Sequence, residues 1–154
     1  MQIREAIIPD ELPLVRTLFQ EYAAGLGVDL CFQGFAEELA GLPGRYDRPA
    51  GGLWLAVEGS DVAGCVALRP LDSEQAEVKR LYVRPAYRGR GVGRALAECV
   101  LQAASAAGYR RVCLDTLPSM IGAIALYRSL GFTEVSQYCH NPVPGAIFLG
   151  RELA

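Results

Sequence analysis

One stretch, residues 78–96, constrains the fold more than any other part of the chain. Its first residues are β-formers and predict a strand over residues 78–83. Pro85 ends that strand, because proline cannot donate to a sheet ladder. From Val92 onward apolar residues recur at helical spacing. Between strand and helix lies a tight turn crowded with glycine, at Gly89, Gly91 and Gly93.

A glycine-rich turn that opens a helix favours phosphate. Its backbone N–H groups point outward at the positive end of the helix dipole, and no side chain keeps an anion away from them. Two common phosphate loops do not fit, because no Gly-Lys-Ser/Thr triplet follows and Leu96 stands where a dinucleotide fingerprint needs its third glycine. A plain strand-to-helix turn that binds nothing is the alternative.

The pattern Arg88-x-x-Gly91-x-Gly93 resembles the acetyl-CoA pyrophosphate loop of the GNAT superfamily of acyl-CoA-dependent N-acetyltransferases. The preceding Lys-Arg-Leu-Tyr-Val-Arg-Pro, residues 79–85, strengthens the resemblance. It implies acetyl-CoA as co-substrate, with the strand amides pairing along the pantetheine arm and the loop binding the pyrophosphate. The cofactor-binding residues implied in this way are Leu81, Tyr82, Val83, Arg88, Gly89, Arg90, Gly91, Val92 and Gly93.

Periodicity along the chain predicts one domain, residues 1–154, of the α/β class, with elements in the order β-α-α-β-β-β-α-β-α-β-β. This is also the order of the GNAT fold. Asp10 and Ser119 are expected to cap the first and last helices. Strands two to four should form an antiparallel meander, and the helical crossover should make strands four and five parallel. The expected strands are residues 2–8, 53–58, 62–68, 76–83, 111–115, 132–138 and 146–153.

Charge and composition exclude several classes of protein. A net charge of −2 argues against nucleic-acid binding. No apolar run approaches the ~20 residues of a membrane span, and Glu5 interrupts any export signal, so we expect a cytoplasmic protein. Five cysteines without a Cys-x-x-Cys or Cys/His cluster indicate inert thiols and no metal. The local arginines are either a solvated face or a counter-charge for a polyanion: Arg80, Arg84, Arg88, Arg90 and Arg94.

Two residues are candidates for catalysis. Tyr127 lies in Ala-Leu-Tyr-Arg-Ser-Leu-Gly-Phe, which matches the second GNAT motif, and the resemblance implies that its hydroxyl protonates the leaving thiolate. Packing alone is the other interpretation. Glu77 stands where some GNAT enzymes carry a glutamate base, but it is equally interpreted as a charge paired with Lys79 or Arg80. His140, the only histidine, is a second candidate base.

The resemblance implies direct attack by a primary amine of a small molecule within a ternary complex. A protein or peptide N-acetyltransferase and a non-catalytic acyl-CoA sensor are the alternatives, and a homodimer is compatible with either. Many GNAT proteins carry an asparagine where this chain has Met120, so that cofactor contact is lost or passes to Ser119. The acceptor wall is expected in residues 22–46 and 138–146. Its candidate lining is apolar (Cys31, Phe32, Phe35, Tyr46) or acidic (Asp29, Glu37, Glu38, Asp47).

Overall fold

The computed structural model describes residues 1–30 and 34–153. In that part of the chain seven strands form one sheet in the order β1-β2-β3-β4-β5-β7-β6. The strands are β1 (Gln2–Glu5), β2 (Gly52–Glu58), β3 (Asp61–Pro70), β4 (Gln75–Val83), β5 (Arg111–Thr116), β6 (Thr133–Glu134) and β7 (Ile147–Glu152). The helices are α1 (Leu12–Leu26), α2 (Phe35–Ala40), α3 (Val92–Ala106) and α4 (Ile121–Ser129), with 3-10 turns η2 (Gly44–Tyr46) and η3 (Pro85–Tyr87). The predicted α/β class and element order are confirmed.

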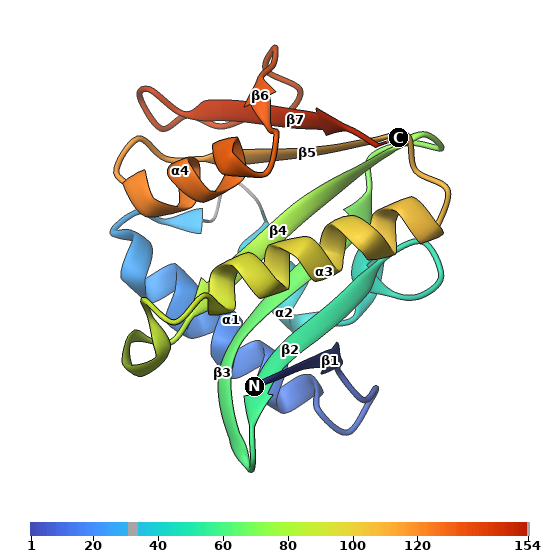
Figure 1. Cartoon of the computed structure of the whole chain (residues 1–154), viewed down its shortest axis with the longest axis vertical. Helices are drawn as coiled ribbons and strands as arrows, with labels where there is room; N and C mark the ends of the chain where they lie inside the picture. Colours follow the sequence, from blue (N-terminus) through green and yellow to red (C-terminus); the bar gives the residue numbers. More distant parts are fainter. Residues whose placement is uncertain (31–33, 154) are drawn as a thin grey trace.

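The sheet carries a hydrophobic core on each face, and helices α1 and α3 lie on opposite faces (Figure 1). Helix α3 packs on one face through the buried stripe of Leu96, Val100 and Ala104, while α1 packs on the other. Successive residues of β2 serve the two cores in turn, Trp54 on the α3 side and Leu55 on the α1 side, because side chains alternate along a strand. Among the described residues, no helix combines the length and apolarity needed to cross a membrane.

The sheet opens between β4 and β5 (Figure 1). The expected meander β2-β3-β4 is antiparallel, and β4 pairs with β5 in parallel as expected. That parallel pairing covers only Gln75–Glu77 against Arg111–Cys113. Farther along, β4 remains paired with β3 up to Val83, and β5 remains paired with β7 up to Thr116. The two central strands therefore diverge.

A bulge in β4 lies where the strands diverge. Cys65 faces Tyr82 and Ala67 faces Lys79, so β4 holds one residue more than β3 over the same distance. Within the bulge Arg80 has φ 60, a left-handed conformation that non-glycine residues rarely adopt. Such a conformation costs on the order of 1–3 kcal/mol and persists only when neighbouring contacts hold it. The holding contact is a two-point ion pair from Arg80 Nε and Nη2 to Glu38, at 3.0 and 2.9 Å.

Four predicted boundaries need correction. The expected strand 132–138 is reduced to β6, because the chain leaves the sheet edge to bring Tyr138 to Glu77. Asp10 does not cap α1, because the N-cap residue is Glu11. The expected first strand, residues 2–8, ends at Glu5. The longer Glu11 side chain reaches the backbone N–H of Ile7 at 2.7 Å. Ser119 likewise gives way to Met120 at the start of α4.

Candidate active site

A cleft of about 500 Å³ lies along the open edge of β4 and ends at the first turn of α3. It contains most of the residues predicted to bind a cofactor. Arg90 is the exception, because its guanidinium pairs with Glu58 at 2.9 Å and stacks over Tyr87. The predicted cofactor residues that line the cleft are Leu81, Tyr82, Val83, Arg88, Gly89, Gly91, Val92 and Gly93.

Gly91 shapes the end of this cleft that lies at the start of α3. It is the N-cap residue of α3 and has φ 79, a conformation open to glycine at little cost. A Cβ built at this position meets no atom within 4 Å, so the requirement is conformational rather than steric. The first amides of a 15-residue helix therefore border the cleft without a covering side chain. Backbone N–H groups and the helix dipole together favour an anion here.

The arginine cluster seen in the sequence is largely neutralised in the fold. Arg88 is the member that borders the cleft, and its Nε donates to the carbonyl oxygen of Val83 at 3.0 Å. The interpretation of the whole cluster as a counter-charge for a polyanion stays a prediction, with Arg88 as the member beside the cleft. Four of its five members form ion pairs with glutamates, at Arg80–Glu38, Arg84–Glu21, Arg90–Glu58 and Arg94–Glu98.

The open edge of β4 supplies backbone groups rather than charges. Beyond Glu77 this edge has no strand partner among the described residues. An exposed row of N–H and C=O groups is a template for an extended ligand. The predicted pairing partners, Leu81 to Val83, lie on this segment and line the cleft. A chain of amides laid along β4 would thus be held by the hydrogen bonds that β5 leaves unmade.

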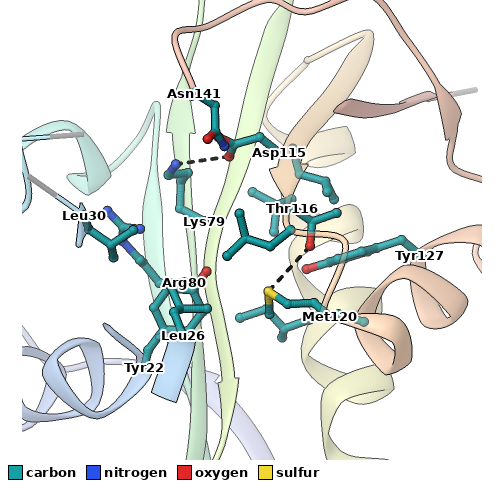
Figure 2. Close-up of a pocket in the computed structure, with 15 residues that line it drawn as sticks. Tyr22, Leu26, Leu30, Lys79, Arg80, Asp115, Thr116, Met120, Tyr127 and Asn141 are labelled. Atoms are coloured by element: carbon teal, nitrogen blue, oxygen red, sulfur yellow. Dashed lines mark hydrogen bonds and ion pairs between the residues drawn. The ribbon is translucent and has the colours of Figure 1, made fainter. Parts of the chain in front are cut away.

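The cleft continues into a smaller cavity of about 40 Å³ between β4 and the start of α4 (Figure 2). Five residues line both spaces: Tyr22, Leu26, Leu81, Met120 and Ala123. Figure 2 shows Tyr22 and Leu26 across the cavity from Met120, and a polar end where Lys79, Asp115 and Asn141 meet. The cavity therefore joins a cofactor-sized cleft to a small polar recess.

Tyr127 projects from α4 into this cavity (Figure 2). Its ring is 6 % exposed and packs edge-on against Phe132 at 5.4 Å. Burial raises the pKa of the Tyr127 hydroxyl above its ordinary value, so the hydroxyl keeps its proton at neutral pH. A protonated hydroxyl is a hydrogen-bond donor, which is the form that a general acid requires.

Buried charge is concentrated around the cavity. In the described part of the chain the fully buried polar or charged residues are Glu77, Lys79, Arg80 and Thr116. Three of these line the cavity, and Glu77 lies beside it. Removing a charge from water costs several kcal/mol even in a relaxed protein, so proteins rarely do this without a function or a close partner.

Glu77 is enclosed by its neighbours. Its side chain is 1 % exposed, accepts a hydrogen bond from Arg69 Nε at 2.7 Å and another from the Tyr138 hydroxyl at 2.6 Å. Lys79 Nζ lies 3.9 Å from its second oxygen. Glu77 is not among the described residues that line the cavity. Its role as the base stays a prediction, and a proton could reach it only through neighbouring groups.

Asp115 is the carboxylate that borders the cavity, and the sequence reasoning missed it. Its side chain is 4 % exposed, lies 3.4 Å from Lys79 Nζ and accepts a hydrogen bond from Asn141 at 3.1 Å. The available signal was a single acidic residue directly after the apolar run of residues 112–114. Carboxylate oxygens of Glu77 and Asp115 and the Cys139 sulfur lie within 4.8 Å of one another, but the Lys79 ammonium is the cation against both carboxylates.

Of the other positions predicted from the sequence, some line the cleft or the cavity and others do not. Met120 lines both cleft and cavity, whereas Ser119 lines neither. His140 is exposed and is not among the described lining residues, so its role as a base stays a prediction. Glu38 is paired with Arg80 and does not act as an open receptor for an amine. Tyr46 is buried in the α1-side core, and Cys31 and Phe32 lie outside the described residues.

Known proteins resemble this chain in both sequence and fold. An uncharacterised N-acetyltransferase of Schizosaccharomyces pombe is 37% identical over 149 residues, covering 96% of this chain and 91% of the relative. The Salmonella typhimurium protein yncA, solved with its cofactor acetyl-CoA, superposes with TM-score 0.78 at 20% identity over 99% of this chain and 94% of its own. The Escherichia coli ribosomal-protein-S18-alanine N-acetyltransferase gives TM-score 0.72 at 22% identity, covering 98% and 92%.

The model of the acetyltransferase (GNAT) family matches residues 16–132, a span from α1 to the residue before β6. This span includes the glycine turn, the bulge of β4 and the helix that carries Tyr127. The chain belongs to the GNAT family of acetyltransferases.

Proposed function

We propose that this protein transfers the acetyl group of acetyl-CoA to a primary amine of a small molecule, by direct attack within a ternary complex. The observation that carries the proposal is the divergence of β4 and β5, which leaves one edge of β4 open between the start of α3 and the Tyr127 hydroxyl. The acetyl-CoA bound in the yncA structure supports the choice of acyl donor, because that protein shares the fold.

In this proposal the N–H groups at the start of α3 and Arg88 bind the pyrophosphate, and the open edge of β4 pairs with the pantetheine arm. The acetyl thioester then reaches the junction of cleft and cavity, beside Leu81 and Tyr127. A backbone N–H of residues 81–83 donates to the thioester oxygen as it gains negative charge.

The reaction needs few further groups. The amine nitrogen attacks the thioester carbon, the carbon–sulfur bond breaks, and the thiolate takes a proton from Tyr127. The attacking amine must lose one proton, for which Glu77 is the base predicted from the sequence. His140 is the alternative base.

A protein N-terminus is the second candidate acceptor, since the Escherichia coli neighbour acts on a ribosomal protein. The small volume of the cavity, about 40 Å³, favours a short acceptor instead. A sensor that binds acyl-CoA without turnover is the third candidate. A homodimer and a cytoplasmic location stay predictions.

Two measurements on the purified protein test the proposal. Calorimetric titration with acetyl-CoA should give binding, and a library of small primary amines should then release free CoA thiol with at least one class. Binding without release from small amines, but with release from a peptide, would favour the protein acceptor. Binding without any release would favour the sensor, and failure to bind acetyl-CoA would overturn the proposal.

A further inference from the structure

The polar end of the cavity contains the only lysine of the chain. Every other permanently cationic side chain is an arginine, and those at the surface commonly pair with glutamate. Lys79 differs in position as well as in type, since its side chain is 4 % exposed and lines the cavity. An ammonium is a compact point charge with three rotatable donors, which suits a small oxygen-rich ligand.

A second donor, the Thr116 hydroxyl, lines the same cavity from β5. The Thr116 residue is 6% exposed, and its hydroxyl approaches the sulfur of Met120 at 3.6 Å. A thioether is a weak acceptor, so a ligand oxygen would be a better partner for this buried hydroxyl. Figure 2 shows Thr116 and Lys79 on opposite strands, facing the same cavity. The wall thus offers hydrogen-bond donors from both sides of the gap.

The carboxylate oxygens that could receive a second positive charge in the cavity already have partners. Asp115 is the only carboxylate among the described residues that line the cavity. One of its oxygens faces Lys79 at 3.4 Å, and the other accepts from Asn141 at 3.1 Å with the Cys139 sulfur at 3.7 Å. A polyamine would bring further ammonium groups to this recess without a carboxylate to receive them, at the cost of burying unpaired charge.

From this arrangement we infer that the acceptor is a short amino carboxylate, such as a small α- or β-amino acid, whose carboxylate binds at Lys79 and Thr116. The inference rests on the proposed function and specifies its substrate. The amine of such a molecule extends toward Tyr127 and the thioester, while its carboxylate takes the donors of the polar end. Polyamines and plain alkylamines lack the group that these donors recognise.

Matched triplets of substrates test the inference on the wild-type protein. Each triplet holds an amino acid (glycine, alanine or β-alanine), its carboxamide and the amine left when the carboxylate is removed; spermidine serves as a polyamine. We expect kcat/KM to be about tenfold or more higher for the amino acid, the usual value of a charge-assisted hydrogen bond. The carboxamide keeps the shape and has the more readily deprotonated amine, so a preference for the acid reports recognition of charge.

Two variants assign the preference to residues. Lys79→Met should abolish the preference for the acid over its carboxamide. Thr116→Val should lower the ratio of kcat/KM for the amino acid to kcat/KM for the decarboxylated amine about fivefold, with Thr116→Ser restoring the wild-type ratio. Thr116→Val removes no charge, which keeps the test available if Lys79→Met fails to fold.

Different results would overturn the inferred substrate and the proposed acetyltransferase function. Equal or faster acetylation of carboxamides, alkylamines or spermidine by a protein that binds acetyl-CoA would overturn the amino carboxylate and leave the acetyltransferase standing. A preference for acids that survives both variants would remove Lys79 and Thr116 from recognition and overturn the inference as well. Absence of acetyl-CoA binding in calorimetry would overturn the proposed function itself.

Discussion

The Tyr138 hydroxyl donates a 2.6 Å hydrogen bond to Oε2 of Glu77, across 61 residues of sequence. This bond attaches the segment after β6 to the buried strand that enters the active site. Burial and the Glu77 charge both raise the pKa of Tyr138, so the hydroxyl stays a donor in alkaline solution. The same carboxylate receives Arg69 on its other oxygen. Glu77 therefore joins two parts of the fold.

Tyr138→Phe should lower the free energy of unfolding by about 2 kcal/mol, because hydrogen bonds to charged groups contribute about 1.5–3 kcal/mol. The ring would keep its edge-on contact with Phe148 at 5.7 Å. Urea denaturation measures the change. Tyr109→Phe is the matched control, since it removes an exposed hydroxyl contact to the carbonyl of Ala50 and should cost less. If both variants lost the same free energy of unfolding, the hydrogen bond from Tyr138 to Glu77 would stabilise the fold no more than the exposed bond of Tyr109.

Glu77→Gln should destabilise the protein by about 3–5 kcal/mol, because breaking a buried pair leaves the Arg69 charge uncompensated. Chemical denaturation measures this loss. A second measurement concerns catalysis: the pH–rate profile of the folded variant. A loss of rate that is recovered at high pH, where more amine is already neutral, supports Glu77 as the base. A loss that is the same at every pH assigns Glu77 to structure alone.

Tyr127→Phe should lower kcat on the order of 10²-fold, the usual range for a general acid, with acetyl-CoA affinity unchanged. The direction of the pKa shift adds a second expectation. Because the pKa of Tyr127 is raised, the donor form persists upward in pH, and the wild-type rate should show no alkaline decline from this group below about pH 10. Tyr109→Phe again serves as control. Full activity of the Tyr127 variant would return this residue to a packing role.

Gly91→Asp should abolish acetyl-CoA binding in calorimetry. The new carboxylate would stand at the start of α3, where the phosphates are proposed to bind, and would repel them. Gly108→Asp is a matched control, because Gly108 also has positive φ, at 92, and follows the other end of α3. The two variants share the backbone penalty but differ in distance from the cleft. Loss of binding in both would point to general destabilisation rather than to the phosphate site.

Glu11 predicts an acid-dependent loss of stability. The hydrogen bond from Arg4, helped by the N–H of Ile7, lowers the pKa of Glu11 from 4.5 to about 2 in the folded protein. A lowered folded pKa means that the contribution is complete above about pH 4.5 and fades as the pH falls toward 2. Glu11→Gln should cost about 1 kcal/mol at pH 7 and flatten the dependence of Tm on pH between these limits. A parallel slope in variant and wild type would refute this assignment.

Local pattern was enough for much of this protein. Strands, helices and their order follow from apolar periodicity, and the glycine turn before α3 follows from residue type, because these features depend on neighbours within a few positions. Most of the cofactor residues predicted from residues 81–93 line one cleft for the same reason: they are contiguous in sequence. Arg90 does not line the cleft, since its guanidinium pairs with Glu58 from a different strand, and its cofactor contact stays a prediction.

The side chains that surround the cavity could be identified only from the tertiary structure. Asp115 contacts both Lys79 and Asn141 at the place where β4 and β5 diverge. The periodicity of apolar residues does not predict where two strands separate. The left-handed bulge at Arg80 depends on Glu38 of α2, which is distant in sequence. Glu77 was predicted either as a base or as a paired charge, and only the fold shows that Arg69 and Tyr138 enclose its carboxylate. Burial and pairing of charge are properties of the packed interior, so the sequence was enough to indicate the family, whereas the tertiary structure determined which polar groups line the cavity.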